Sequence, residues 1–176
     1  LNCSRLIYRK PVCAPSSGFK HMNKKINQPD PVLAASLTDF LCFAVYSTNL
    51  AFGRAYKPLF DELGITYPQY VTLIALNEES DQTVTELGEK LFLESSTLTP
   101  LLKRLEAAGY VTRTRDTEDE RQVRIALTKE GKAIFEKAFC GRERVIEATG
   151  LDYETFVRLQ RDLLTLRDNL LEASER

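Results

Sequence analysis

The feature that most constrains the fold is a change of hydrophobic period in the middle of the chain. Residues 98–105 carry leucines spaced i, i+3, i+4 and i+7, the stripe of an amphipathic helix, and Gly109 follows as its stop. Residues 111–115 and 123–127 instead alternate apolar and polar side chains on either side of a charged turn, which is typical of a hairpin. A helix that leads directly into a hairpin requires a fold that mixes helices with a small sheet.

Helical periodicity returns on both sides of this hairpin. The pattern from Leu37 to about Leu63 is helical and ends at Gly64, and we expect Pro58 to break it because proline removes a backbone hydrogen bond. Four more helices are predicted: from Thr66 or Tyr67 to about Asn77, from Thr83 or Thr85 through "TVTELGEKLFL", from after "TKEG" to about Ala148, and over residues 153–173. The fold class is therefore mainly α with a small β-hairpin (α+β), a winged helix-turn-helix domain plus a helical layer from both chain ends.

The long helices at the chain ends carry wide apolar stripes. The stripe of the last helix consists of Phe156, Leu159, Leu163, Leu166 and Leu170. A helix with such a stripe has to bury it against another element, and the winged helix does not supply one. We therefore expect two copies of the chain to pair across a two-fold axis as a homodimer.

The composition excludes several kinds of function. His21 is the only histidine among 176 residues, which removes most zinc, haem and histidine-based catalytic sites. The eight glycines are scattered and form no phosphate-binding loop, and no apolar run approaches the roughly 20 residues that span a bilayer. We expect no cofactor, no metal and no catalytic residue, in a soluble, cytoplasmic protein that is not an enzyme and has no membrane contact.

The first 21 residues differ from the rest of the chain. They contain four of the 24 basic residues, none of the 25 acidic ones and two of the four cysteines. Met22, the only methionine, opens a polar leader over residues 22–35. We interpret residues 1–21 as a non-native or disordered extension. The two remaining cysteines, Cys42 and Cys140, fit a cytosolic protein better than a disulfide-rich scaffold.

The helix before the hairpin carries the groups that a recognition helix needs. In a helix-turn-helix domain the second helix enters the major groove and presents its first residues to base edges. Those positions hold hydroxyls, a proline and two basic side chains: Ser95, Ser96, Thr97, Thr99, Pro100, Lys103 and Arg104. Hydroxyls can reach bases or phosphates, and methyl groups can contact thymine. Taken alone, "SSTLTP" reads as an ordinary capped helix start; the hairpin behind it favours DNA binding.

Arginines concentrate on the hairpin, at the position of a wing. They are Arg113, Arg115, Arg121 and Arg124. An arginine at this position can enter a narrow minor groove. The neighbouring Asp116, Asp119 and Glu120 nearly cancel the charge, and we expect them to orient the arginines through paired hydrogen bonds. The DNA-binding residues that we select here are Arg113, Arg115, Asp119 and Arg121.

These elements divide the chain into parts. Residues 66–131 form the predicted winged helix-turn-helix DNA-binding region. Residues 36–65 and 132–176 form the predicted helical dimerisation region, after the leader and the extension described above.

The hairpin and its surroundings also carry a family resemblance. The segment "DTEDERQVRIALTKEGK" is similar to the wing signature of the MarR family of winged-helix repressors, an Asp-x-Arg followed by a hydrophobic strand and Leu-Thr-x-x-Gly. The matching residues are Asp119, Arg121, Leu127, Thr128 and Gly131. The segments "DFLCFAVYS", "KPLFDELGITYPQYVTLIAL" and "STLTPLLKRLEAAGYVTRTRD" resemble the organic-hydroperoxide resistance regulators of that family, over roughly Pro31 to Lys132.

This resemblance implies how the protein works. It implies a dimeric repressor that binds pseudopalindromic, double-stranded operator DNA. Cys42 stands at the position of the family's sensor, so its oxidation by an organic hydroperoxide, the inducer, would release the repressor from DNA.

Cys42 lies among apolar residues in "TDFLCFAVYSTN", where a cysteine is either a small core residue or a reactive thiol. Ser36 or Thr38 would cap a helix with Cys42 in its first turn or two, and the helix dipole there stabilises a thiolate. No Lys or Arg is nearby in the sequence, so hydroxyl donors would have to stabilise the charge. The resemblance assigns that role to two tyrosines, at the positions of Tyr56 and Tyr67.

The spacing of these residues bears on the dimer. Tyr56 follows Cys42 by fourteen residues, which is about 21 Å on a continuous helix. Unless the chain reverses, Tyr56 can therefore reach only the Cys42 of an antiparallel second copy.

Cys140 lies on the penultimate predicted helix, in "KAFCGRERV". It is either a buried thiol on an apolar face or a resolving cysteine that condenses with oxidised Cys42 to a disulfide. The resemblance places a chain with this second cysteine in the two-cysteine branch of the regulators, and we expect the disulfide to join subunits.

Other functions remain open on the sequence alone. The same fold could be a MarR-type repressor that is induced by a small phenolic or apolar ligand without thiol chemistry. It could also be a thiol peroxidase that uses Cys42, although no basic residue flanks that thiol. A third alternative is a winged helix that binds proteins and never DNA.

Overall fold

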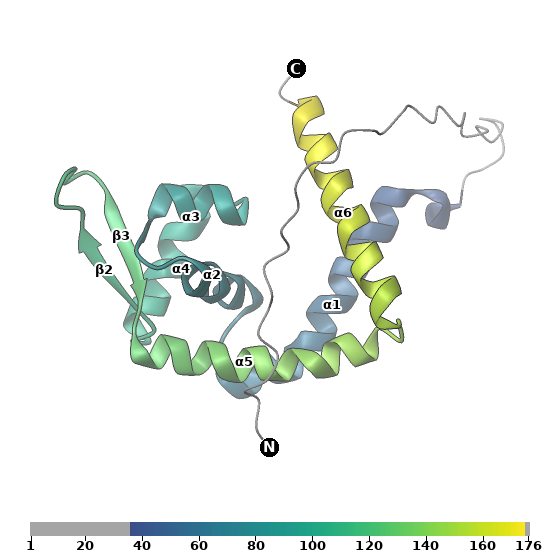
Figure 1. Cartoon of the computed structure of the whole chain (residues 1–176), viewed down its shortest axis with the longest axis horizontal. Coiled ribbons are helices and arrows are strands. Elements are labelled where there is room, and N and C mark those ends of the chain that lie inside the picture. Colours follow the sequence, from purple (N-terminus) through teal and green to yellow (C-terminus); the bar gives the residue numbers. More distant parts are fainter. Residues whose placement is uncertain (1–35, 175–176) are drawn as a thin grey trace. The chain divides into compact units, whose positions relative to one another are not determined.

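The computed structural model describes residues 36–174 (Figure 1). The predictions for the extension 1–21 and the leader 22–35 lie outside the described residues. The chain divides into two compact units, Leu1–Asn49 and Leu50–Arg176, which are taken in turn. Within the described part, none of the helices is both long enough and apolar enough to cross a membrane.

The first unit contains a 3-10 turn, Leu37–Asp39, and the opening of helix α1 (Leu41–Leu63). The prediction of one continuous helix from Leu37 was wrong, because Phe40 has an extended backbone. The Asp39 carboxylate accepts a hydrogen bond from the Ser36 amide at 2.9 Å, which closes the short turn before the helix can continue. Since α1 starts at Leu41, Cys42 is the second residue of its first turn.

Helix α1 continues into the second unit without a break at Pro58, so this prediction was also wrong. Proline removes one backbone hydrogen bond, but neighbouring contacts hold the turn. Lys57 and Asp61 form an ion pair at 2.7 Å on the exposed face, and Phe60 is buried on the other. The helix ends as expected at Gly64, whose φ of +66° is easiest for glycine.

The winged helix follows within the second unit. Its elements are α2 (Tyr67–Glu78), β1 (Gln82–Thr83), α3 (Val84–Leu91), α4 (Ser95–Ala107), β2 (Val111–Arg115) and β3 (Val123–Leu127). Thr66 caps α2 and Thr83 caps α3, each the first of the two predicted positions. Glu94 is the N-cap of α4, and Gly109, at φ +76°, ends the turn that follows it. The predicted order of helices and hairpin is confirmed.

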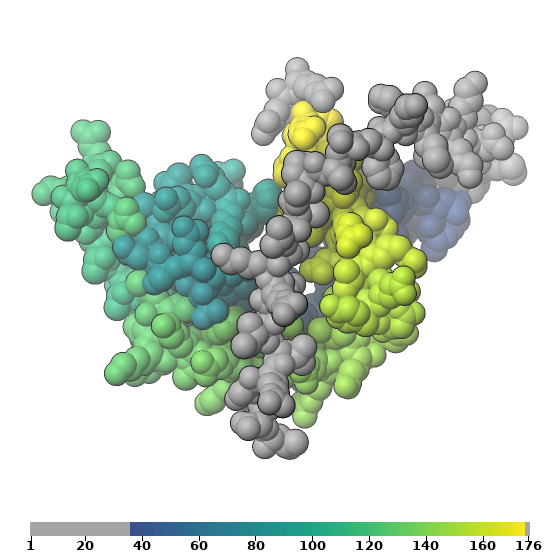
Figure 2. Space-filling view, viewed as in Figure 1, coloured from purple at the N-terminus to yellow at the C-terminus, as the bar shows by residue number. Residues whose placement is uncertain are grey.

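The sheet has three antiparallel strands in the order β1-β3-β2, not the two that the sequence predicts. Strand β1 is only two residues long, too short to show a period, and pairs Gln82 with Ile125. The Gln82 side chain is buried because its amide donates to the carbonyls of Ala75 and Glu79, at 2.8 and 2.6 Å. Figure 2 shows the tip of the β2–β3 hairpin projecting beyond the helices beside it.

The leucine stripe of α4 forms the centre of the core. Leu98, Leu102 and Leu105 are fully buried and pack with residues of α2, α3 and the sheet, including Leu73 and Ile125. Burying a leucine side chain stabilises a fold by roughly 1.5–3 kcal/mol. This packing fixes which face of α4 turns outward, which is what a recognition helix requires.

Helix α5 (Lys129–Ala148) is attached to the root of the hairpin by the Leu-Thr-x-x-Gly segment. The Thr128 hydroxyl donates to the Gly109 carbonyl at 2.7 Å and accepts from the Gly131 amide at 2.9 Å. A side chain at Gly131 would collide with the Tyr110 carbonyl, so only glycine fits. The last helix, α6 (Tyr153–Ser174), has no buried residue in this single chain.

Candidate DNA interface and thiol site

The outward face of α4 carries the predicted recognition residues. Six of the seven, Ser95, Ser96, Thr97, Pro100, Lys103 and Arg104, are exposed, and Thr99 is half-buried. Hydroxyls fill the first turn, and the two basic side chains follow one turn later. This arrangement offers polar groups to a groove while the leucines of the same helix stay in the core.

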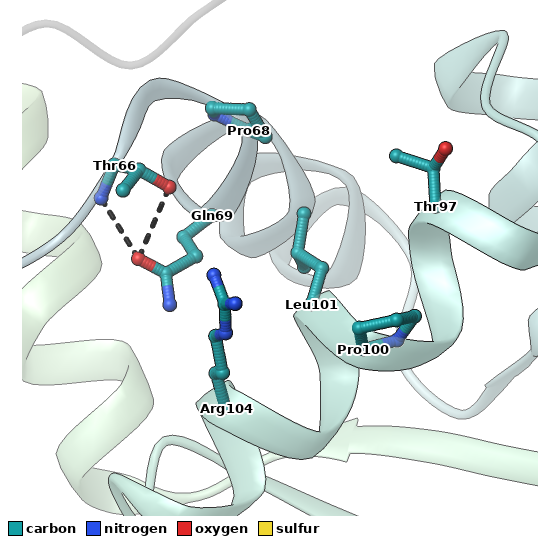
Figure 3. Close-up of a pocket in the computed structure, with 7 residues that line it drawn as sticks. All are labelled: Thr66, Pro68, Gln69, Thr97, Pro100, Leu101 and Arg104. Carbon is teal, nitrogen blue, oxygen red and sulfur yellow. Dashed lines mark hydrogen bonds between the residues drawn. The ribbon is translucent and has the colours of Figure 1, made fainter.

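A shallow hollow lies between the N-terminus of α2 and this face of α4 (Figure 3). Its volume is about 210 Å³, and its lining residues are Thr66, Pro68, Gln69, Thr97, Pro100, Leu101 and Arg104. The Gln69 side-chain oxygen accepts from the Thr66 amide at 2.8 Å, and Arg104 extends toward this pair. The hollow is smaller than the roughly 300–1,000 Å³ of ordinary ligand pockets.

One ion pair holds the loop end of the wing, where β2 leads into the turn. The buried Asp116 carboxylate accepts from the amides of Glu118 and Asp119, at 2.7 and 3.1 Å, and from the Arg124 guanidinium. These hydrogen bonds lower the pKa of Asp116, the backbone amides contributing most. Arg124 also donates to the Asp81 carbonyl at 2.9 Å, which ties the wing to the start of β1.

Asp119 does not pair with an arginine side chain, contrary to the predicted paired hydrogen bonds. Its carboxylate accepts from the Arg121 backbone amide at 3.0 Å and from the Gln122 side chain at 3.2 Å. The Asp-x-Arg pattern therefore shapes the turn and leaves the Arg121 guanidinium outside it.

The hairpin arginines fall into two classes. Arg113 pairs with Glu106 of α4 at 3.3 Å, and about one fifth of its side chain is exposed. Arg115 and Arg121 are exposed, and no carboxylate of the described residues forms an ion pair with either. Arg115 and Arg121 are thus the available cations of the wing, whereas Arg113 braces the hairpin against the recognition helix.

The expectation that Asp116 orients a wing arginine through a hydrogen bond is confirmed, and the arginine is Arg124. The strand register explains the choice of partner, because Thr114 lies opposite Arg124. Side chains alternate along a strand, so Asp116 shares a face with Thr114 and hence with Arg124.

Both predicted redox thiols are exposed in the single chain. Cys42 lies in the first turn of α1, where no basic residue is near it in the sequence. Cys140 lies on α5. The interpretation of either thiol as a buried core residue was therefore wrong for the isolated chain.

The structure brings the two predicted tyrosines together. The rings of Tyr56, on α1, and Tyr67, on α2, lie 6.0 Å apart, and both contact Phe60. Tyr56 also contacts Tyr70, with ring centroids 6.1 Å apart. Tyr67 is about half exposed, and Tyr56 is half-buried. Burial, and to a smaller extent the neighbouring Tyr67, raises the pKa of Tyr56. Burial, and to a smaller extent Tyr56, raises the pKa of Tyr70 to about 12. The Tyr56 hydroxyl is therefore protonated near neutral pH and can act as a hydrogen-bond donor.

Sequence comparison identifies relatives across most of the chain. A family model described as "Transcriptional regulator SarA/Rot" matches residues 54–138. The HTH-type transcriptional regulator TtmR of Methylorubrum extorquens is 45% identical over 158 residues, which cover 90% of this chain and 80% of the relative. The organic hydroperoxide resistance transcriptional regulator of Bacillus subtilis is 42% identical over 134 residues, 76% of this chain and 91% of the relative.

Solved structures agree with this fold. The structure of reduced AbfR bound to DNA, a protein of Staphylococcus epidermidis, is 36% identical and covers 77% of this chain and 94% of its own, with a TM-score of 0.60. A mutant MarR from Escherichia coli complexed with operator DNA is 26% identical and covers 72% of this chain and 92% of its own, with a TM-score of 0.66. The winged helix, its Leu-Thr-x-x-Gly junction and these relatives together show that the chain belongs to the MarR-like family of winged-helix transcriptional regulators.

Proposed function

We propose that this regulator is a redox-sensing repressor, which binds operator DNA as a homodimer in the cytoplasm and leaves it when an organic hydroperoxide oxidises Cys42. The observation that carries the proposal is the Tyr56–Tyr67 pair, with ring centroids 6.0 Å apart. The two rings are neighbours, as two donors to one thiolate would have to be. The hydroperoxide function named for the Bacillus subtilis relative supports the same chemistry.

The dimer is supported by uncovered apolar side chains on two long helices. Helix α1 exposes Leu41, Val45, Leu50 and Phe52, and α6 exposes Leu159, Leu163, Leu164, Leu170 and Leu171. Several large apolar side chains exposed along one helix mark an interface in a soluble protein. A second copy of the chain offers the same surfaces and so provides a self-complementary partner.

The sensing step is a two-electron oxidation of the thiol. The Cys42 thiolate attacks the terminal oxygen of the hydroperoxide, an S–O bond forms and the O–O bond breaks. The leaving alkoxide takes up a proton and departs as an alcohol, so the sulfur becomes a sulfenic acid and the peroxide is reduced. Tyr56 and Tyr67 assist by donating hydrogen bonds to the thiolate, which favours its charged form.

The tyrosines that serve one thiol belong to the other subunit in this proposal. Cys42 and Tyr56 are both on α1, fourteen residues apart, which corresponds to about 21 Å along a helix. An antiparallel second copy reverses the direction of α1 and can bring its tyrosines to Cys42.

Cys140 completes the cycle as the resolving thiol. Its sulfur attacks the Cys42 sulfenic sulfur, a disulfide forms, and the sulfenic oxygen leaves as water. A disulfide needs Cα atoms within about 7 Å of each other, so closing it imposes a fixed geometry on α5, and that constraint disturbs the DNA-bound arrangement.

DNA binding uses α4 and the wing. The α4 residues named above enter the major groove, while Arg115 and Arg121 reach the neighbouring minor groove. Asp119 shapes the wing turn that presents Arg121. Contacts to phosphates make the affinity fall steeply with salt.

The decisive experiment measures operator binding with and without cumene hydroperoxide, for the parent protein and for Cys42→Ser. The DNA is a duplex selected for binding by the reduced protein. The parent should lose the DNA on oxidation, and Cys42→Ser should keep it. Release of Cys42→Ser by the hydroperoxide would contradict thiol sensing and support the alternative of a phenolic or apolar inducer.

A further inference from the structure

Arg142 of α5 adds a positive charge near Tyr56 and Tyr70. Its guanidinium carbon lies 3.9 Å from the centre of the Phe139 ring, a cation–π contact that fixes the side chain along the helix. The residue is half-buried, and no carboxylate of the described residues forms an ion pair with it. The charge is therefore not neutralised by an acidic neighbour there.

Close packing holds α5 against the helices that carry the tyrosines. Ala138 is fully buried and packs in one cluster with Phe60 and Tyr70. Gly141 faces Leu59 of α1 so closely that a side chain at position 141 would come within 2.5 Å of a Leu59 methyl carbon. Arg142 is the next residue, so its backbone is set by a tight helix contact and not by a surface loop.

The charge of Arg142 acts on the tyrosine hydroxyls. Burial raises the pKa of Tyr56, Tyr67 raises it further, and Arg142 opposes both. For Tyr70 the order is burial, Tyr56, then Arg142, which again lowers the pKa. The groups that act on Tyr56 are thus Tyr67 from α2 and Arg142 from α5. A phenol beside a cation holds its proton less tightly and donates a stronger hydrogen bond to an anion.

We propose that Arg142 is a positioning residue for peroxide sensing, which polarises the Tyr56 hydroxyl and so strengthens its hydrogen bond to the Cys42 thiolate of the second copy. This proposal rests on the sensing function proposed above. It supplies the cation that the surroundings of Cys42 in the sequence lack. The charge acts on the thiol through the Tyr56 hydroxyl, and it comes from a residue one hundred positions after Cys42 in the chain.

The test is a double-mutant cycle. The rate of sulfenic acid formation with cumene hydroperoxide is measured against pH for the parent, Arg142→Gln, Arg142→Lys, Tyr56→Phe and Arg142→Gln/Tyr56→Phe. Arg142→Gln should slow the reaction about threefold or more, since part of a hydrogen bond to a charged group is lost, and should move the pH profile upward. Arg142→Lys, which keeps the charge, should restore most of the rate. In the Tyr56→Phe background, Arg142→Gln should have no further effect.

Two controls separate the proposed role from a structural one. Ultraviolet titration of the tyrosines should show ionisation at higher pH in Arg142→Gln than in the parent. Reduced Arg142→Gln should bind the selected duplex like the parent, which reports an intact fold. An equal slowing by Arg142→Gln with and without Tyr56 would overturn the proposal, because the arginine would then act by another route.

The outcomes also distinguish this proposal from the function on which it rests. A slowed Tyr56→Phe together with a parental rate in Arg142→Gln rejects the role of Arg142 and leaves thiol sensing intact. A parental rate in Tyr56→Phe rejects the tyrosine role and the Arg142 role together. Failure of Arg142→Lys to restore the rate, with unchanged tyrosine titration, also rejects polarisation.

Discussion

Asp116 and Arg124 join the two strands of the wing beside the turn that connects them, through a hydrogen-bonded ion pair in which the carboxylate is buried and also accepts hydrogen bonds from two backbone amides. The pair fixes the turn that follows β2. It therefore decides how the exposed Arg121 is presented, although neither Asp116 nor Arg124 has to contact DNA.

Removing the charge of Asp116 should loosen the wing. The pKa of Asp116 is lowered from its ordinary value of 3.8 in the folded protein, so the stability that it contributes is present above about pH 4 and is lost as the pH falls through the folded value. We expect Asp116→Asn to lower the protection of amides 117–122 against hydrogen exchange at pH 7. We also expect it to remove the loss of protection that the parent shows as Asp116 becomes protonated at acidic pH. Glu120→Gln, an exposed neighbour, is the control; equal exchange in both variants would contradict the role of Asp116.

The two classes of wing arginine should behave differently. Arg121→Ala should weaken binding of the selected duplex by about 1–3 kcal/mol. If Arg121 contacts a phosphate, the slope of the logarithm of the binding constant against the logarithm of the salt concentration should also fall by about one in magnitude. Arg113→Ala should affect thermal unfolding as well, because it removes the ion pair with Glu106. Arg144→Ala, on α5, should leave affinity unchanged. Binding isotherms at several salt concentrations check this, and equal affinities for Arg121→Ala and Arg144→Ala would reject the wing contact.

The junction between the hairpin and α5 should tolerate no side chain. Gly131→Ala places a carbon against the Tyr110 carbonyl, so the backbone must shift, and we expect a loss of about 1–3 kcal/mol in the free energy of unfolding. Lys132→Ala, an exposed change in the same turn, should have little effect. Urea unfolding measures both variants, and a fully stable Gly131→Ala would show that the junction can relax.

The Tyr67 hydroxyl should tune the thiol without affecting DNA binding. Tyr67→Phe removes a donor to the thiolate, and hydrogen bonds to charged groups contribute roughly 1.5–3 kcal/mol, so the reaction with cumene hydroperoxide should slow about tenfold or more. Tyr153→Phe is the matched control, since Tyr153 is highly exposed on α6. Stopped-flow rates that do not differ between the two variants would reject the hydroxyl account.

The two cysteines should have different roles: Cys42 reacts with the peroxide, and Cys140 forms the disulfide. Cys42→Ser should bind DNA and ignore oxidant, whereas Cys140→Ser should form the sulfenic acid but no disulfide and drift to the sulfinic form under excess peroxide. With Cys3 and Cys13 replaced, a non-reducing gel of the oxidised parent should show a covalent dimer that Cys140→Ser lacks. A monomeric band together with a mapped Cys42–Cys140 peptide would contradict the bond between subunits. The absence of a Cys42–Cys140 peptide would exclude Cys140 from the mechanism.

The parts of the fold that depend on local pattern could be predicted from the sequence. The leucines of α4 show the helical period because three of them are fully buried on one face, and the hairpin shows period two for the same reason. Strand β1 was missed because its two residues are strand only through pairing with β3. The interruption at Phe40 and the continuity at Pro58 depend on side-chain contacts that periodicity does not record.

In the candidate site, too, some features follow from the local sequence and others depend on tertiary contacts. The residue types on α4 and the position of Cys42 at a helix start follow from local sequence. The contacts of Arg113 with Glu106 and of Arg124 with Asp81 do not, because Glu106 lies on another element and Asp81 is 43 residues from Arg124. The role proposed for Arg142 could not be predicted for the same reason, since it depends on the packing of Ala138 and Gly141 of α5 against other helices.

The Thr128–Gly131 junction gives α5 the properties of a lever. With 20 residues the helix is about 30 Å long, so a tilt of about 10° displaces one end relative to the other by about 5 Å. One end is fastened to the root of the wing by two hydrogen bonds and a glycine contact that leave no slack. Cys140 lies eleven residues along the helix from Lys129, so the proposed disulfide would pull on α5 near its middle and transmit the force, through the junction, to the hairpin that carries Arg115 and Arg121.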